Sequence, residues 1–311
     1  MLLTTLPALT YQQSLAKATS PQPPAGTLGP PPHLVELCGA PYELRLSRPD
    51  ALDGSHVEFG IQRLALRPAC FYLRGILSGA ECDHLIAAGD RERTQPAMSA
   101  GGMERPGCSV AWLDVQQDPV ASELAAVVAE LLLTPEIRSG WGTGGGFENL
   151  QVLRYAVGGE FELHHDANEE TPRTLSLLLY LNGKGETWFP LASNDPNLAE
   201  SSRLPTRANP RKRAAALQAL EGVMPGQDGL LVSPNKGDAV AFYNFVDDGS
   251  GMLDRFAFHA GMPAKDEKSV AALWYHLGEE ASDAIARAHA QNSSQPAGAV
   301  PVAAVGTVAR L

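Results

Sequence analysis

The sequence predicts a mainly β fold with flanking helices, of the α+β class. Two amphipathic helical segments come first, and eight short apolar segments bounded by Gly, Pro, Asn and Asp follow them. Strands and helices do not alternate, which argues against a doubly wound nucleotide-binding fold. Such a run of short strands is typical of a β-sandwich or jelly roll with the helices packed on one side.

Both predicted helices have clear start signals. Ser78-Gly-Ala-Glu81 has the pattern of a capping box, and Leu85 and Ile86 follow as residues to bury. Asp118-Pro119 predicts the start of the second helix, because proline is favoured in the first helical turn. Its apolar stripe comprises Val120, Leu124, Val127, Val128, Leu131 and Leu132.

Beyond the glycine-rich segment 142–146 the apolar pattern changes to that of strands. The predicted strands are 149–156, 161–166, 174–181, 186–189, 229–233, 238–243, 255–259 and 268–275.

The two ends of the chain differ in composition from this body. The first 35 residues hold seven of the 24 prolines and no acidic residue, which predicts a disordered leader over 1–35. We expect an N-terminal extension over 36–66, one domain over 67–277 and an alanine-rich tail over 278–311. An insertion at 191–228 carries Arg203, Arg207, Arg211, Lys212 and Arg213, and it is either a solvated excursion or a lid or docking surface for an anion.

Composition excludes several classes of protein. The 24 Lys and Arg residues against 35 Asp and Glu residues leave a net charge of −11, so we expect no nucleic-acid partner. No stretch reaches 18 apolar residues, so we expect no membrane span. Cys38, Cys70, Cys82 and Cys108 form no CxxC pair and are predicted to be free buried thiols. We expect a cytoplasmic protein, and an organellar or endoplasmic reticulum location stays open.

The segment 155–166 contains a candidate metal site. In an extended strand His164 and Asp166 point to one face, and His165 points away to pack in the strand or behind the site. An imidazole and a carboxylate on one face make two-thirds of a facial triad for non-haem iron. His259, predicted to end a later strand, is the candidate third ligand, because jelly-roll strands distant in sequence lie side by side.

Lys268 and Tyr155 are candidates for binding an anionic cosubstrate. Lys268 opens an apolar strand, and a buried ammonium requires an anionic partner such as a carboxylate. Tyr155 can donate its phenolic hydrogen bond to the same carboxylate. The alternatives are an exposed lysine at a strand end and an ordinary core tyrosine.

Six motifs in order resemble the prolyl 4-hydroxylase-like iron(II)- and 2-oxoglutarate-dependent dioxygenases, over 67–277. They are Leu150-Gln-Val-Leu-Arg-Tyr155, Gly158 with His164-x-Asp166, Leu178-Leu-Tyr-Leu-Asn182, Gly185-Glu-Thr-Trp-Phe-Pro190, Pro234-Asn-Lys-Gly-Asp238 with the run to Asn244, and His259-Ala-Gly-Met-Pro263 with Lys268 and Trp274.

This resemblance implies a double-stranded β-helix (jelly roll) core with N-terminal helices packed on one side. It implies that His164, Asp166 and His259 hold Fe(II), that Lys268 and Tyr155 bind 2-oxoglutarate, and that ascorbate serves as reductant. It places Glu148, Trp274 and His276 in the groove for a peptide. Phe161 stands where related enzymes often have tyrosine.

We therefore expect a dioxygenase that hydroxylates a protein or peptide at proline while 2-oxoglutarate is decarboxylated to succinate. The same chemistry on a small molecule stays open, as does a non-catalytic β-sandwich binding module. The complete set of His164, Asp166, His259 and Lys268 argues against the binding module. Oxidative demethylation of nucleic acid is disfavoured, because the chain is acidic and no paired arginines follow His259.

Overall fold

The computed structural model describes residues 28–32, 34, 44–92, 95–98, 104–138, 145–167, 172–195, 203–204, 229–247 and 251–278. Most of the predicted leader, most of the 191–228 insertion and all but the first residue of the predicted tail lie outside these ranges, as does Cys38.

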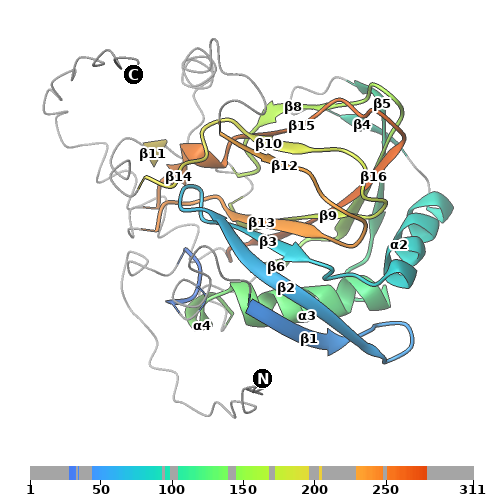
Figure 1. Cartoon of the computed structure of the whole chain (residues 1–311), viewed down its shortest axis with the longest axis horizontal. Helices are drawn as coiled ribbons and strands as arrows, with labels where there is room; N and C mark the ends of the chain where they lie inside the picture. The colour runs from blue at the N-terminus through green and yellow to red at the C-terminus, as the bar shows by residue number, and fades with distance from the viewer. Residues whose placement is uncertain are drawn as a thin grey trace, which may run out of the picture.

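Two antiparallel sheets pack face to face, as the predicted double-stranded β-helix requires (Figure 1). The larger sheet has the order β1 (Leu44–Pro49), β2 (His56–Ala65), β3 (Cys70–Arg74), β13 (Ala239–Tyr243), β9 (Arg173–Tyr180), β16 (Lys268–His276), β7 (Leu150–Tyr155), β5 (Glu104–Leu113) and β4 (Gln95–Met98), with β6 (Gly146–Phe147) paired to β16. The smaller sheet has the order β12 (Leu230–Val232), β10 (Thr187–Phe189), β15 (His259–Gly261) and β8 (Phe161–His164). A further short pair joins β11 (Arg203–Leu204) to β14 (Leu253–Asp254).

The central strands of the larger sheet are buried on both faces. Side chains alternate along a strand, so Leu177 and Leu273 pack toward the helices while Phe242 and Val270 pack between the sheets. This double burial explains why β9, β13 and β16 have nearly continuous apolar sequences.

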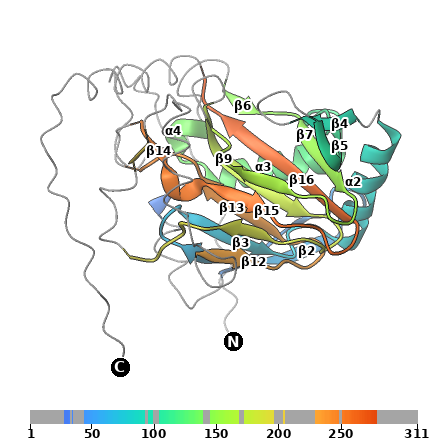
Figure 2. The same ribbon diagram turned by 90° about the horizontal axis from the view of Figure 1, so that it is seen from above.

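The helices cover the face of the larger sheet that is turned away from the smaller sheet (Figures 1 and 2). They are α2 (Gly79–Arg91), α3 (Pro119–Leu132) and the short α4 (Pro135–Arg138). The capping box at Ser78 is confirmed, and the Asp118 side chain caps α3 by accepting from two backbone N–H groups. None of the helices among the described residues has the length and hydropathy needed to span a bilayer.

Seven of the eight predicted strand segments contain a strand, and the segment 255–259 is wrong. Arg255–Ala257 form a 3-10 turn (η2), because the Asp254 carboxylate accepts from the Phe256 N–H and turns the chain. As a result, His259 begins β15 instead of ending a strand.

Strands also occur where the sequence analysis predicted none. β1 and β2 lie within the predicted extension 36–66, yet they continue the larger sheet beyond β3. The boundaries of the domain stay predictions. Cys70, Cys82 and Cys108 are free and buried, as expected.

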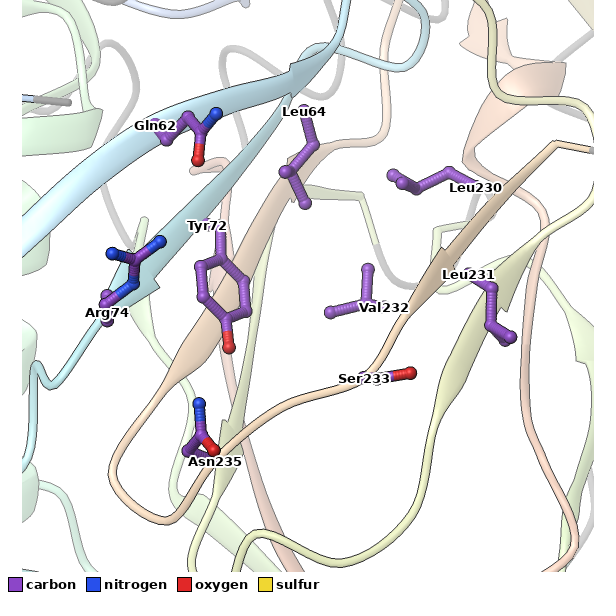
Figure 3. Close-up of a pocket in the computed structure, with 9 residues that line it drawn as sticks. All are labelled: Gln62, Leu64, Tyr72, Arg74, Leu230, Leu231, Val232, Ser233 and Asn235. Carbon is purple, nitrogen blue, oxygen red and sulfur yellow. The ribbon is translucent and has the colours of Figure 1, made fainter. Parts of the chain in front are cut away.

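A surface cavity of about 380 Å³ lies where the larger sheet extends past the smaller one (Figure 3). Gln62, Leu64, Tyr72 and Arg74 line it from β2 and β3, and residues 230–233 and Asn235 line it from β12 onward. None of these residues belongs to the predicted metal or cosubstrate site.

A buried ion pair joins β1 to the first turn of α2. The guanidinium of Arg48, which is 4% exposed, pairs with the fully buried carboxylate of Glu81. The same carboxylate accepts from the backbone N–H groups of Ala51 and Ser78. Glu81 therefore ties the predicted extension to the helix that follows it.

We predict that Glu81→Gln lowers the free energy of unfolding by about 3 kcal/mol, because it leaves the buried Arg48 charge uncompensated. Asp266→Asn, which removes the exposed partner of Lys184, is the control and should change stability by less than about 1 kcal/mol. Urea denaturation of the variants measures both. Equal losses of stability in the two variants would contradict the role of Glu81 as the partner of a buried charge.

Candidate functional site

Three side chains converge at one end of the space between the sheets and could hold a metal ion. His164 ends β8, Asp166 follows two residues later, and His259 begins β15, where it pairs in register with His164. One potential ligand atom from each of the three lies within 4.8 Å of the others. The structure therefore brings together the three residues that the sequence analysis selected.

Backbone carbonyl groups orient both imidazoles. Nδ1 of His164 lies 2.7 Å from the Glu162 carbonyl oxygen, and Nδ1 of His259 lies 3.0 Å from that of Ala257. Each Nδ1 therefore carries the proton, which leaves the Nε2 lone pair free to bind a metal. Both Nε2 atoms face Asp166, at 3.3 Å from Oδ1 for His164 and 3.9 Å from Oδ2 for His259.

Burial and neighbouring groups set the protonation states of His259 and Asp166. Burial and the neighbouring His164 lower the pKa of His259 to about 3, so this imidazole is neutral at pH 7. Burial on its own raises the pKa of Asp166, but the electrostatic influence of His259 and His164, together with Ser176, outweighs it and holds that pKa well below its ordinary value. A neutral imidazole and an ionised carboxylate are the forms that bind a metal.

His165 is not part of the triad. It points away from Asp166, packs edge-on against Phe258, and lies with Nε2 3.0 Å from the Asp254 carbonyl oxygen. Nδ1 accepts from the Ala167 N–H. Burial lowers the pKa of His165, so it is a neutral packing histidine, as the strand alternation predicted.

Lys268 and Tyr155 lie opposite each other on β16 and β7, with the Lys268 Nζ 4.2 Å from the centre of the tyrosine ring. Lys268 is only 3% exposed, and its ammonium donates to the Met262 carbonyl oxygen at 3.1 Å. No carboxylate within the described ranges forms an ion pair with it. Burial lowers the pKa of Lys268 to about 8. A buried cation of this kind is suited to an anionic ligand.

The Tyr155 hydroxyl already has a partner in the protein. It is buried, with its pKa raised well above the ordinary value, and it is hydrogen-bonded to the Cys108 thiol on β5. Cys108 lies opposite Tyr155 in register, so the tyrosine stands between a thiol and an ammonium. A thiol is a weak hydrogen-bond partner, which leaves the hydroxyl able to donate to a ligand.

Two glycines make room for the Lys268 side chain. A Cβ atom at Gly185 would overlap Lys268 Cδ, and Gly185 also has a φ of +88°. A Cβ atom at Gly261 would lie 3.4 Å from Lys268 Nζ and 3.2 Å from Phe161 Cβ. The absence of side chains here is what allows the lysine to extend below β8 and β15.

The three residues that the resemblance places in a peptide groove have different environments. Trp274 donates from Nε1 to Asp166 Oδ2 at 3.0 Å. Glu148 forms a two-pronged ion pair with Arg173, at 2.6 and 2.7 Å. His276 ends β16 opposite Arg173, with its Nδ1 3.2 Å from the Leu277 carbonyl oxygen.

Phe161 forms part of the wall beside the metal-binding triad. Its ring centre lies 4.0 Å from that of His164, and the Arg105 guanidinium lies 3.3 Å from it. Arg105 Nε is buried and has no hydrogen-bond partner among the described residues. Phe161 brings no hydroxyl to this wall, so Arg105 is the polar group at this position.

The sequence analysis assigned no role to Arg105, Arg173 or Ser176, and it quoted Gly185 only as part of a motif. The sequence does indicate that Ser176 has a special role, since it is a polar residue inside the buried run 174–181. The same holds for Arg173, a charged residue directly before that run. Neither indication identifies a partner, because the partners lie on strands that are distant in sequence.

Known proteins are similar to this chain over the same region. The family model described as the 2OG-Fe(II) oxygenase superfamily matches residues 150–276. Prolyl 4-hydroxylase 2 of Arabidopsis thaliana is 26% identical over 234 residues, covering 70% of each protein. Probable prolyl 4-hydroxylase 7 of the same plant is 28% identical over 234 residues, covering 70% of this chain and 65% of the relative. The viral collagen prolyl hydroxylase of Paramecium Bursaria Chlorella virus-1 superposes with a TM-score of 0.44 and 22% identity, covering 67% of this chain and 96% of the viral one.

We predict that Gly185→Ala lowers the free energy of unfolding by at least about 1 kcal/mol, because alanine disfavours the positive φ and displaces the Lys268 stem. The control is Gly79→Ala at the start of α2, where no atom lies within 4 Å of the added Cβ atom. This variant should be neutral or stabilised by up to about 1 kcal/mol. Chemical denaturation compares the two, and equal stability changes would contradict the packing argument.

Proposed function

We propose that this chain is a 2OG-Fe(II) oxygenase, like the family whose model matches residues 150–276, and that it hydroxylates proline in a protein or peptide while 2-oxoglutarate is decarboxylated to succinate. The observation that carries the proposal is the convergence of His164, Asp166 and His259, with Lys268 buried nearby between the same two sheets.

The donor set fits a non-haem Fe(II) ion. Two imidazoles and one carboxylate form the facial set that such iron prefers, and this set leaves coordination positions open for other ligands. When bound, the iron supplies the activation of dioxygen that the protein itself cannot provide. The role of the chain is to orient the three ligands and to exclude water, through the rings of Phe189 and Phe242 that pack on His259.

Lys268 and Tyr155 are proposed to bind the distal carboxylate of 2-oxoglutarate. A buried ammonium next to a phenolic hydroxyl matches the charge and the acceptor oxygens of a carboxylate. Ascorbate as the reductant and a cytoplasmic location stay predictions.

The relatives named as prolyl 4-hydroxylases support proline as the substrate residue. A small-molecule substrate is the second candidate, and Phe161 is the observation that favours it. Here a phenylalanine in contact with both Arg105 and His164 stands where a hydroxyl-bearing ring is expected, so substrate contacts on this wall differ from those of related enzymes. The complete triad continues to argue against a non-catalytic binding module.

We predict that the protein supplied with Fe(II), ascorbate, 2-oxoglutarate and proline-containing peptides forms succinate and peptide products heavier by one oxygen atom. His164→Ala and His259→Ala should abolish both, because each removes a metal ligand. His56→Ala, at an exposed histidine on β2, is the matched control and should keep full activity.

Mass spectrometry of peptide and metabolite pools reads out this experiment. Succinate formation that survives in both triad variants would refute the site. If oxygen is added only to metabolites, the result would refute proline as the hydroxylated residue and support the small-molecule alternative.

We predict that 2-oxoglutarate affinity weakens as the pH rises above about 8, by up to about tenfold per pH unit. The sign follows from the pKa of Lys268, which is about 8 in the free protein and rises when a dianion binds, so binding above pH 8 requires proton uptake. The neighbouring Cys108 and Tyr155 both have raised pKa values, so neither gains charge near pH 8.

Calorimetry on Mn(II)-loaded protein between pH 7 and 9.5 measures this dependence. Lys268→Arg is the control, because a guanidinium keeps its charge throughout this range and should show a flat profile. An equal decline of 2-oxoglutarate affinity in both proteins would rule out Lys268 as the origin of the pH dependence.

A further inference from the structure

The carboxylate of Asp166 is held from the opposite sheet, and we propose that Trp274 and Ser176 are the positioning residues that restrict Asp166 to a single oxygen for the metal. This inference rests on the proposed function, since it presupposes that the triad binds a metal ion. It assigns to Trp274 a role different from the peptide contact that the resemblance implies.

The two oxygens of Asp166 have different surroundings. Oδ1 faces His164, at 3.3 Å from Nε2. Oδ2 accepts from the Trp274 indole N–H at 3.0 Å. Ser176 is a further polar group beside the carboxylate, and it lowers the pKa of Asp166. Trp274 and Ser176 lie directly opposite each other on β16 and β9, so the two donors approach from one place on the larger sheet.

Each donor is itself oriented by a further contact. Ser176 Oγ accepts from Asn244 Nδ2 at 2.9 Å, which leaves the hydroxyl proton available for Asp166. Both Ser176 and Asn244 are fully buried, so water does not compete for these bonds. The bond from Asn244 therefore restricts the orientation of the Ser176 hydroxyl.

The indole is clamped in its plane. The Arg173 guanidinium lies 3.9 Å from the Trp274 ring, and Glu148 fixes that guanidinium through two hydrogen bonds. Arg173 also donates to the Asp166 backbone carbonyl at 3.4 Å. The chain Glu148–Arg173–Trp274 thus holds the N–H group against Oδ2 and leaves it little rotational freedom.

The consequence is a carboxylate that can offer only one oxygen. An unrestrained carboxylate can bind a metal through both oxygens and so occupy a further coordination position. A hydrogen bond from a buried indole on Oδ2 opposes that rotation, because a carboxylate that turns leaves the N–H unsatisfied. The two donors therefore keep one position free for cosubstrate or dioxygen.

The test is Co(II) titration of the metal-free protein, followed by visible absorption without cosubstrate. Trp274→Phe keeps the ring over Arg173 and removes the N–H, and Ser176→Ala removes the second donor. Each should weaken Co(II) affinity about tenfold and alter the spectrum. The matched control is Trp112→Phe, at a tryptophan on β5 that is 46% exposed, with its ring centre 6.3 Å from that of Trp274. This variant should bind Co(II) as the unaltered protein does.

The thermal midpoint of each metal-free variant separates positioning from folding, because a purely structural role lowers the midpoint and leaves the affinity of the folded protein unchanged. If Trp274→Phe and Ser176→Ala both bind Co(II) with the affinity and spectrum of the unaltered protein, this inference is overturned while the proposed function stands. If Trp274→Phe does not fold, the Co(II) affinity and spectrum of Ser176→Ala test the inference. Failure of the unaltered protein to bind Co(II) overturns the proposed function together with the inference.

Discussion

The buried carboxylate of Asp166 is the constraint on which the site depends. A carboxylate that is 7% exposed keeps its charge only if neighbouring groups replace the water it has lost. The smaller sheet supplies two imidazoles, and the larger sheet supplies an indole N–H and a hydroxyl. Because these partners come from both sheets, the charge is stabilised only when the sheets are packed together. Formation of the metal site is therefore coupled to formation of the sandwich.

Strand alternation separates the two tasks of the larger sheet. On β16 the odd-numbered residues Ala271, Leu273 and Tyr275 pack toward the helices. The even-numbered positions turn toward the smaller sheet and include Lys268 and Trp274, which bear the chemistry. One nine-residue strand thus completes the apolar core with one face and furnishes a cation and an indole donor with the other. A shift of register by one residue would exchange these faces and destroy both.

The space around Lys268 and the triad depends on side-chain atoms that neighbouring residues lack. Gly185 and Gly261 leave room for the lysine stem, and Phe161 lacks the hydroxyl that a tyrosine would add. The guanidinium of Arg105 lies over that ring, 3.3 Å from its centre. This part of the wall departs from the pattern that the sequence resemblance implies, whereas His164, Asp166 and His259 come together as the resemblance implies.

Local signals in the sequence determined the start of α2 at Ser78, the start of α3 at Asp118, most strands after 149, and the pairing of His164 with Asp166. Each of these rests on residues that interact within a few positions or on the two-residue period of a strand. Tertiary structure alone decided that β1 and β2 join the larger sheet, that residues 255–257 form a turn before His259, and that Trp274 hydrogen-bonds to Asp166. The last pair is 108 residues apart in sequence. No periodicity encodes such a contact, because it arises only when β16 and the end of β8 face each other across the packed sheets.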